Sequence, residues 1–263
     1  ARATPWVALA APVSAGCAAT RPLAPRPAPA VLPTAAQLEA TLAARRDAVR
    51  SLRALARLRY RDGRESNSSH EAIVVARPDR LRVEVLSLFG SVFVLTARDG
   101  TLTAYARQDA TVYQGQASPE NLWRYARIGL PVSDLVDILL GTPPSRLGGH
   151  AQVAFEPSSG WIRLRQDLDD RSQVVWFSEA ELPVAAEERD GGGEPVWHAT
   201  FAEYEDHAGF PVATRIGLEM PDAQRSVDVA LEDIDLNPTL DHSIFAFQTP
   251  PGSKIVNLDR VAD

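Results

Sequence analysis

Polar and apolar residues alternate along residues 80–85, which is the period of a strand with one buried face. The alternation then ends in Leu88 and Phe89, directly before Gly90. Turn positions normally carry glycine and small polar residues. The pattern therefore predicts a hairpin tip with two large apolar side chains, which either project into solvent or fold under the sheet.

Segments of strand length fill two further stretches of the chain, most of them separated by short runs of turn-type residues. The predicted strands cover residues 55–63, 70–78, 80–87, 91–100, 102–108, 110–115, 151–157, 160–168, 172–179, 182–190, 195–205, 211–220 and 225–236, before a C-terminal segment at 241–256. The pair Asp99-Gly100 is typical of a tight hairpin. Because the strands within each stretch follow one another without intervening helices, the pattern predicts antiparallel meanders and not βαβ units.

Helical patterns precede and interrupt these strands. Residues 34–55 open with Thr34 and Gln37 at the spacing of a capping box, and apolar residues then recur at helical spacing as Leu38, Leu42, Val49 and Leu52. This predicts a long amphipathic helix with an arginine-rich outer face.

A pair of shorter helices is predicted between the two runs of strands. Ser118 and Pro119 are a cap and a first-turn proline for residues 118–127. Residues 130–141 then place Leu135, Ile138 and Leu139 on one face, with Gly141 closing the helix.

These elements predict a mainly β fold, a single curved antiparallel sheet of about eleven to twelve strands with helices on its concave apolar face. The alternative is a pair of small α+β domains divided near Gly141.

The N-terminal region reads as a targeting segment. Residues 1–16 are apolar and end in small residues before Cys17, as in a bacterial lipobox, although Ser14 stands where leucine is usual. Residues 17–33 are rich in proline and alanine, the composition of an extended tether. We therefore expect a truncated signal-peptide remnant at 1–16, a lipidated Cys17 with a tether at 17–33, and a folded domain at 34–263. The alternative is an ordinary secretory cleavage region with an incidental cysteine.

Composition excludes some functions and does not name one. A net charge of -7 and a pI near 5.3 argue against a nucleic-acid binder. The five histidines are scattered, and the sequence contains no P-loop, nucleophile elbow or dinucleotide fingerprint. Acidic clusters at residues 167–170 and 232–235 lie in or beside strands, so we interpret them as solvated faces and not as calcium sites. No metal or cofactor is expected, and an enzyme is disfavoured.

The order of several short motifs resembles the bacterial outer-membrane lipoprotein carrier and receptor family, LolA and LolB. "ARPDRLRVEV" at 76–85 and "LFGS" at 88–91 follow a long helix. "SPENLWRYARIGLPVSDLVDILLGTP" at 118–143 resembles the receptor, whereas "FAFQTPPGSKIV" at 245–256 resembles the carrier. The likeness covers about residues 38–257.

The resemblance implies a half-open barrel whose apolar cavity holds the acyl chains of lipoproteins. It implies a monomeric outer-membrane lipoprotein that faces the periplasm, receives acylated lipoproteins from a periplasmic carrier and helps to insert them. The alternatives are a tethered or periplasmic carrier of another lipid, and an envelope sensor or protein-interaction domain on the same fold.

The resemblance also suggests roles for individual residues. Leu88, Phe89 and Gly90 match a membrane-insertion loop, and Arg77 matches an arginine that holds a helical lid closed; the alternative for Arg77 is an ordinary edge-strand arginine. The residues expected to line the cavity are Leu81, Val83, Val85, Val92, Val94, Leu95, Leu135, Ile138, Leu139, Ile162 and Leu164.

Overall fold

The computed structural model describes residues 26–146, 149–221 and 224–260. The predictions for residues 1–16 and for Cys17 therefore lie outside the described residues. The strands are β1 (Ser51–Asp62), β2 (Glu65–Ala76), β3 (Arg80–Ser87), β4 (Gly90–Arg98), β5 (Thr101–Ala106), β6 (Thr111–Gln116), β7 (His150–Glu156), β8 (Trp161–Asp167), β9 (Arg171–Phe177), β10 (Pro183–Asp190), β11 (Pro195–His207), β12 (Phe210–Met220), β13 (Arg225–Leu236) and β14 (Lys254–Asn257). The α-helices are α1 (Ala35–Ala48), α2 (Pro119–Ala126) and α3 (Val132–Leu139), and the 3-10 helices include η2 (His242–Phe245) and η3 (Leu258–Arg260).

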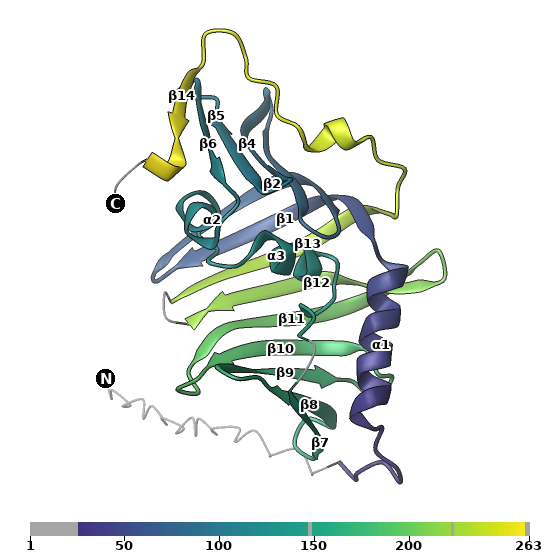
Figure 1. The fold of residues 1–263 in the computed structure, drawn as a ribbon. Coiled ribbons are helices and arrows are strands. Elements are labelled where there is room, and N and C mark those ends of the chain that lie inside the picture. Colours follow the sequence, from purple (N-terminus) through teal and green to yellow (C-terminus); the bar gives the residue numbers. More distant parts are fainter. Residues whose placement is uncertain (1–25, 147–148, 222–223, 261–263) are drawn as a thin grey trace, which may run out of the picture.

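Within the described residues, all of these strands belong to one 14-stranded sheet with the order β14-β6-β5-β4-β3-β2-β1-β13-β12-β11-β10-β9-β8-β7. The first and last strands of the two runs meet in its middle, where β1 pairs antiparallel with β13. The sheet is curved and open (Figure 1). The predicted single curved sheet is confirmed, and the alternative division into two domains near Gly141 is wrong.

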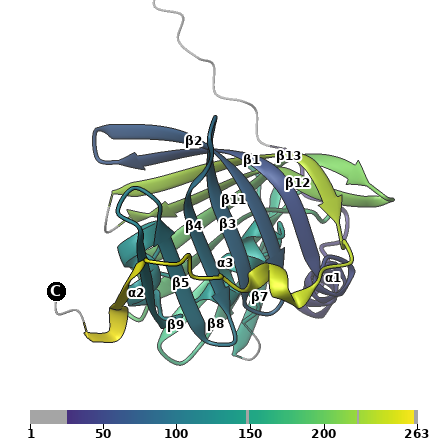
Figure 2. The ribbon, with the colours of Figure 1, turned by 90° about the horizontal axis from the view of Figure 1, so that it is seen from above.

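The C-terminal segment departs from the prediction. Only Lys254–Asn257 of the stretch at 241–256 is a strand, and it pairs parallel with β6 while the other strand pairs are antiparallel. The preceding residues cross the outer side of β3, β4 and β5 (Figure 2). Arg82 donates to the carbonyl of Ile244 at 3.0 Å, and the ring of Phe247 lies 5.1 Å from that of Tyr105.

Helix α1 begins as predicted and ends earlier. Thr34 and Gln37 form the capping box, and the helix stops at Ala48 because Val49 already has extended backbone angles. Val49 lies just before β1 and Leu52 lies within it, and both side chains are buried. Their helical spacing therefore does not reflect a helix.

The expected arginine-rich outer face of α1 is not what the structure shows for Arg45. Arg45 is buried, with its guanidinium carbon 4.9 Å from the centre of the Phe210 ring and 5.4 Å from that of Tyr204. Cation–π contacts of this kind stabilise a desolvated guanidinium. Arg45 therefore faces the protein and not the solvent, whereas Arg46 is partly exposed.

Helices α2 and α3 lie over the concave side of the sheet (Figure 1). The Ser118 side chain accepts a hydrogen bond from the backbone of Asn121, and Pro119 opens α2, as predicted. Gly141 follows α3 with a φ of 68°, a left-handed conformation that glycine adopts without strain. No helix among the described residues is long and apolar enough to cross a membrane.

Candidate functional site: an apolar cavity beneath two helices

An apolar cavity of about 310 Å³ lies between the sheet and the helical pair. Its walls come from β4, β3, β2, β1, β13 and β12, which are consecutive in the sheet, and from α3 and the end of α2. The volume is at the lower end of the range of about 300–1,000 Å³ for small-molecule sites. The central part of the curved sheet therefore forms one side of the cavity, and the helices form the other.

Strand alternation supplies the apolar wall. Side chains two residues apart share a face, so β3 presents Leu81, Val83 and Val85, and β4 presents Phe93 and Leu95. The same alternation on the paired strands β12 and β13 adds Ile216, Leu218, Val227 and Val229.

The structure separates the residues expected to line the cavity into two groups. Those on its wall are Leu81, Val83, Val85, Leu95, Leu135, Ile138 and Leu139. Val92 and Val94 do not line it, because they alternate with Phe93 and Leu95 and so point to the other face of β4. Ile162 and Leu164 are buried in β8, four positions along the sheet from β12, the nearest strand of the cavity wall, and belong to the general core.

One polar residue of the wall was missed by the sequence analysis. Glu71 of β2 is 6% exposed, and its carboxylate accepts a hydrogen bond from the Ser69 hydroxyl at 2.9 Å. Burial raises the pKa of Glu71, and the Ser69 hydrogen bond opposes that shift. A carboxyl group thus interrupts an otherwise apolar surface.

Polar side chains gather near the end of α2. The Tyr60 hydroxyl, on the cavity wall, lies 3.2 Å from the carboxylate of Asp62, which also accepts from Arg225 at 2.9 Å. The guanidinium of Arg225 lies 4.4 Å from the centre of the Trp123 ring in α2. These contacts join β1, β13 and α2 beside the cavity.

Arg77 lies between β2 and β3 and contacts helix α3. It donates to the carbonyl of Val49 at 2.9 Å and forms an ion pair with Asp137 of α3. Arg46 of α1 pairs with the same carboxylate. Burial and the like charge of Arg46 lower the pKa of Arg77 to about 10, so the guanidinium remains cationic at neutral pH. Asp137 therefore connects α3 to both α1 and the β2–β3 junction.

A second ion cluster anchors α3 from the other side. Arg146 pairs with Asp134 of α3 and, at 2.8 Å, with Glu188 of β10. Arg171 also reaches Glu188, at 3.0 Å. The helix that covers the cavity is thus held by acid–arginine contacts on both sides.

The β3–β4 hairpin exposes its apolar tip. Leu88 is 97% exposed and Phe89 is 88% exposed, so they do not fold under the sheet. The Phe89 carbonyl accepts from Arg107 at 3.0 Å, and its backbone N–H donates to Ser87 at 3.2 Å. Gly90 has a φ of 97°, which a side chain would strain. The tip is therefore braced by polar contacts while its side chains face solvent.

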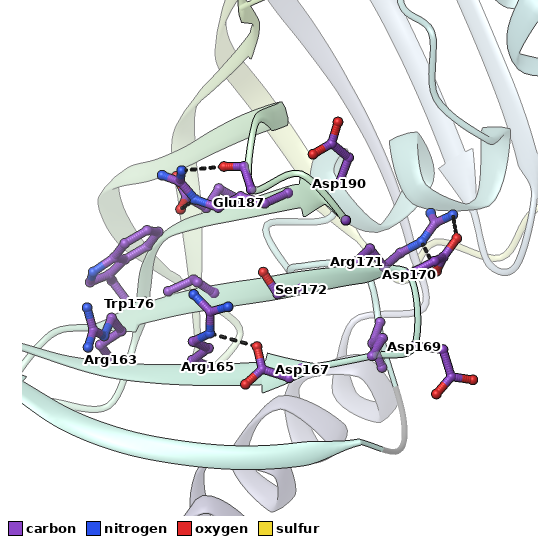
Figure 3. A pocket seen from close by; sticks show the side chains of 15 residues that line it. Arg163, Arg165, Asp167, Asp169, Asp170, Arg171, Ser172, Trp176, Glu187 and Asp190 are labelled. Atoms are coloured by element: carbon purple, nitrogen blue, oxygen red, sulfur yellow. Dashed lines mark hydrogen bonds and ion pairs between the residues drawn. The ribbon is translucent and has the colours of Figure 1, made fainter.

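A second, polar cavity of about 530 Å³ lies over β8, β9 and β10 (Figure 3). Its charged side chains form ion pairs with each other: Arg165 with Asp167 at 2.7 Å, Arg171 with Asp170 at 3.1 Å, and Arg189 with Glu187 at 2.6 Å. The described residues contain no group of three or more side chains suited to hold a metal ion. The internal pairing favours a network of surface ion pairs over a binding site.

Comparison with known proteins identifies the fold. The sequence matches no protein-family model and no curated protein. A DUF1329 family protein from Desulfovibrio piger is similar in structure, with a TM-score of 0.56, 12% identity, and coverage of 80% of this chain and 95% of that one. A domain from Vibrio parahaemolyticus named for outer membrane lipoprotein sorting has a TM-score of 0.53, 14% identity, and coverage of 81% and 97%.

A LolA superfamily protein from Nitrosomonas europaea is similar over a comparable length, with a TM-score of 0.51, 13% identity, and coverage of 80% of this chain and 97% of that one. The structure therefore defines the class of protein by its fold, an open, curved β-sheet with helices over its concave side. This is the fold that the LolA superfamily protein also has.

Proposed function

We propose that this chain binds the acyl chains of lipoproteins in the cavity beneath α2 and α3. The cavity carries the proposal. Six adjacent strands and two helices form its wall, which is apolar except at Glu71 and beside the polar side chains near the end of α2. Each buried methylene contributes about 0.8 kcal/mol, so burial of part of an acyl chain would give a firm and reversible complex. The names of the Vibrio and Nitrosomonas proteins agree with this class of ligand.

The proposed cellular role is lipoprotein localisation at the outer membrane, from the periplasmic side and with a periplasmic carrier as donor. The solvent-exposed Leu88 and Phe89 support a step at a lipid surface, since apolar residues at a loop tip partition into the interface. A lipidated Cys17 and the tether at 17–33 would hold the domain near that surface. In this role the chain is a binding protein and not an enzyme, and it acts as a monomer.

Arg77 would act as the closing contact of the lid. Its ion pair with Asp137 holds α3 over the cavity, so entry of a ligand requires that pair to lengthen or break. The carrier of another lipid, without insertion, is the second candidate; the polar rim formed by Tyr60, Asp62 and Arg225 favours it, because a polar headgroup could lie there.

Displacement of a fluorescent fatty acid by a triacylated lipopeptide tests the binding proposal. The Cys17→Ser chain should bind the lipopeptide, and Val83→Asp should abolish binding by placing a charge on the wall. Val92→Asp is the matched control, because Val92 lies on the other face and is 42% exposed. Equal binding by both aspartate variants, with both folded by circular dichroism, would contradict the proposed cavity.

A further inference from the structure

Glu71 is unusual for its position in the cavity. It lies in the middle of the apolar wall, and its partners on the adjoining strands are Ala56 on β1 and Val85 on β3. No charged side chain contributes to the shift of its pKa, which arises from burial opposed by the Ser69 hydrogen bond. A carboxyl group at such a point weakens the packing of a plain hydrocarbon chain.

The carboxyl group retains the capacity to accept further hydrogen bonds. Two carboxylate oxygens offer about four acceptor sites. Ser69 donates to Oε1 at 2.9 Å, and among the described residues no other hydrogen bond to this side chain is recorded. A plain acyl chain would displace water from the remaining sites and supply no donor in return. A ligand with a donor at this depth would replace that water.

We propose that Glu71 selects acyl ligands that carry a hydrogen-bond donor in the part of the molecule that enters the cavity. This inference rests on the proposed function. Two lipid features share the chemistry, the hydroxyl of a hydroxylated acyl chain and the N–H of an amide-linked chain. An ester-linked or unsubstituted chain lacks the donor and leaves the carboxylate without a partner.

The other polar residues of the wall fill this role less well. The Tyr60 hydroxyl donates to Asp62, and the oxygens of Tyr60 and Tyr125 are uncharged acceptors, which bind a donor less strongly than a carboxylate does. Arg127 is exposed and offers donors, not acceptors. Glu71 is therefore the strongest hydrogen-bond acceptor on the cavity wall.

Two matched pairs of ligands test the inference on the full 263-residue chain at pH 8. The first pair is the methyl esters of N-hexadecanoylglycine and O-hexadecanoylglycolate, which differ by N–H against oxygen. The second is the methyl esters of 3-hydroxyhexadecanoic acid and hexadecanoic acid, so that no probe carries a charge of its own. The wild-type chain should bind the donor-bearing member of at least one pair about tenfold more tightly, the effect of one hydrogen bond to a charged group. The pair that shows the preference identifies the donor as an amide or a hydroxyl.

Variants assign the preference to Glu71. Glu71→Leu should bind both members of each pair equally and should bind the donor-free member more tightly than wild type. Glu71→Gln, which has the same shape and still accepts a hydrogen bond, should keep a reduced preference even where the leucine variant folds poorly. Glu65→Gln is the control on the same strand, because Glu65 is exposed and outside the cavity.

Equal affinities in wild type for both pairs, or a preference that persists in Glu71→Leu, would overturn the inference while leaving acyl binding intact. Failure of all four ligands to bind would overturn the proposed function, and this inference with it.

Discussion

Phe89 and Glu71 each lie in surroundings of the opposite polarity. Phe89 holds an aromatic ring in solvent, and Glu71 holds a carboxyl group in an apolar wall. The unusual tip was visible in the sequence, because Leu88 and Phe89 interrupt a clean alternation. Glu71 was not visible, because Val74 on the opposite face of β2 is also buried and the strand reads as an apolar run without a clear period.

Phe89→Ala should weaken the binding of the Cys17→Ser chain to phospholipid vesicles by about ten- to a hundredfold, since burying a phenylalanine side chain contributes about 1.5–3 kcal/mol. Vesicle sedimentation measures the change. Leu55→Ala is the control, because Leu55 is an apolar residue on the outer face of β1 and is 43% exposed. A loss of the same size in both variants would show that the tip has no special role.

Glu71→Gln should stabilise the folded chain at pH 8 and lose that advantage in acid. Because burial raises the pKa of Glu71 in the folded state, the native protein binds the proton more tightly than the unfolded chain does. The wild type therefore loses the contribution of Glu71 to its stability as the pH rises from 4.5, the ordinary pKa of glutamate, through the raised pKa of the folded state. The glutamine variant has no such contribution to lose. Urea unfolding of both chains at pH 4 and pH 8 measures this. A difference in unfolding free energy between variant and wild type that is the same at both pH values would contradict the burial of Glu71.

At the scale of elements, caps and hairpins were predictable, whereas ends that depend on distant contacts were not. The Ser118 cap and the Asp99-Gly100 turn are local signals, and both hold. The end of α1 was placed too late because Val49 and Leu52 satisfy helical spacing while packing as strand residues. β14 reaches β6 only because the chain before it crosses the outer face of the sheet. No local sequence pattern predicts that path.

Helix α3 gives a prediction at this scale. Asp137→Asn should reduce the free energy of unfolding by about 3 kcal/mol, because it leaves Arg77 and Arg46 without their shared carboxylate in a buried site. Asp235→Asn should change it by less than about 1 kcal/mol, since Asp235 pairs with Arg53 at an exposed site. Chemical denaturation of both variants measures the contrast, and equal losses would show that Asp137 does not hold α3 in place.

At the scale of the whole molecule, two β-meanders join through β1 and β13 into one sheet whose middle forms the cavity. Alternation placed Leu81, Val83 and Val85 on one face of β3, and the structure turns that face toward the cavity. Alternation could not show that β12 and β13 complete the wall, because β13 pairs with β1 across more than 160 residues of sequence and β12 pairs in turn with β13. The curvature that makes the cavity concave likewise depends on the complete sheet.

The most direct test of the central claim is native mass spectrometry of the Cys17→Ser chain purified from a bacterial host without detergent. The account predicts a co-purifying lipid or acylated peptide that is retained by Val92→Asp and lost from a folded Val83→Asp variant. A clean mass of the polypeptide alone, which stays unchanged after incubation with a triacylated lipopeptide, would contradict it.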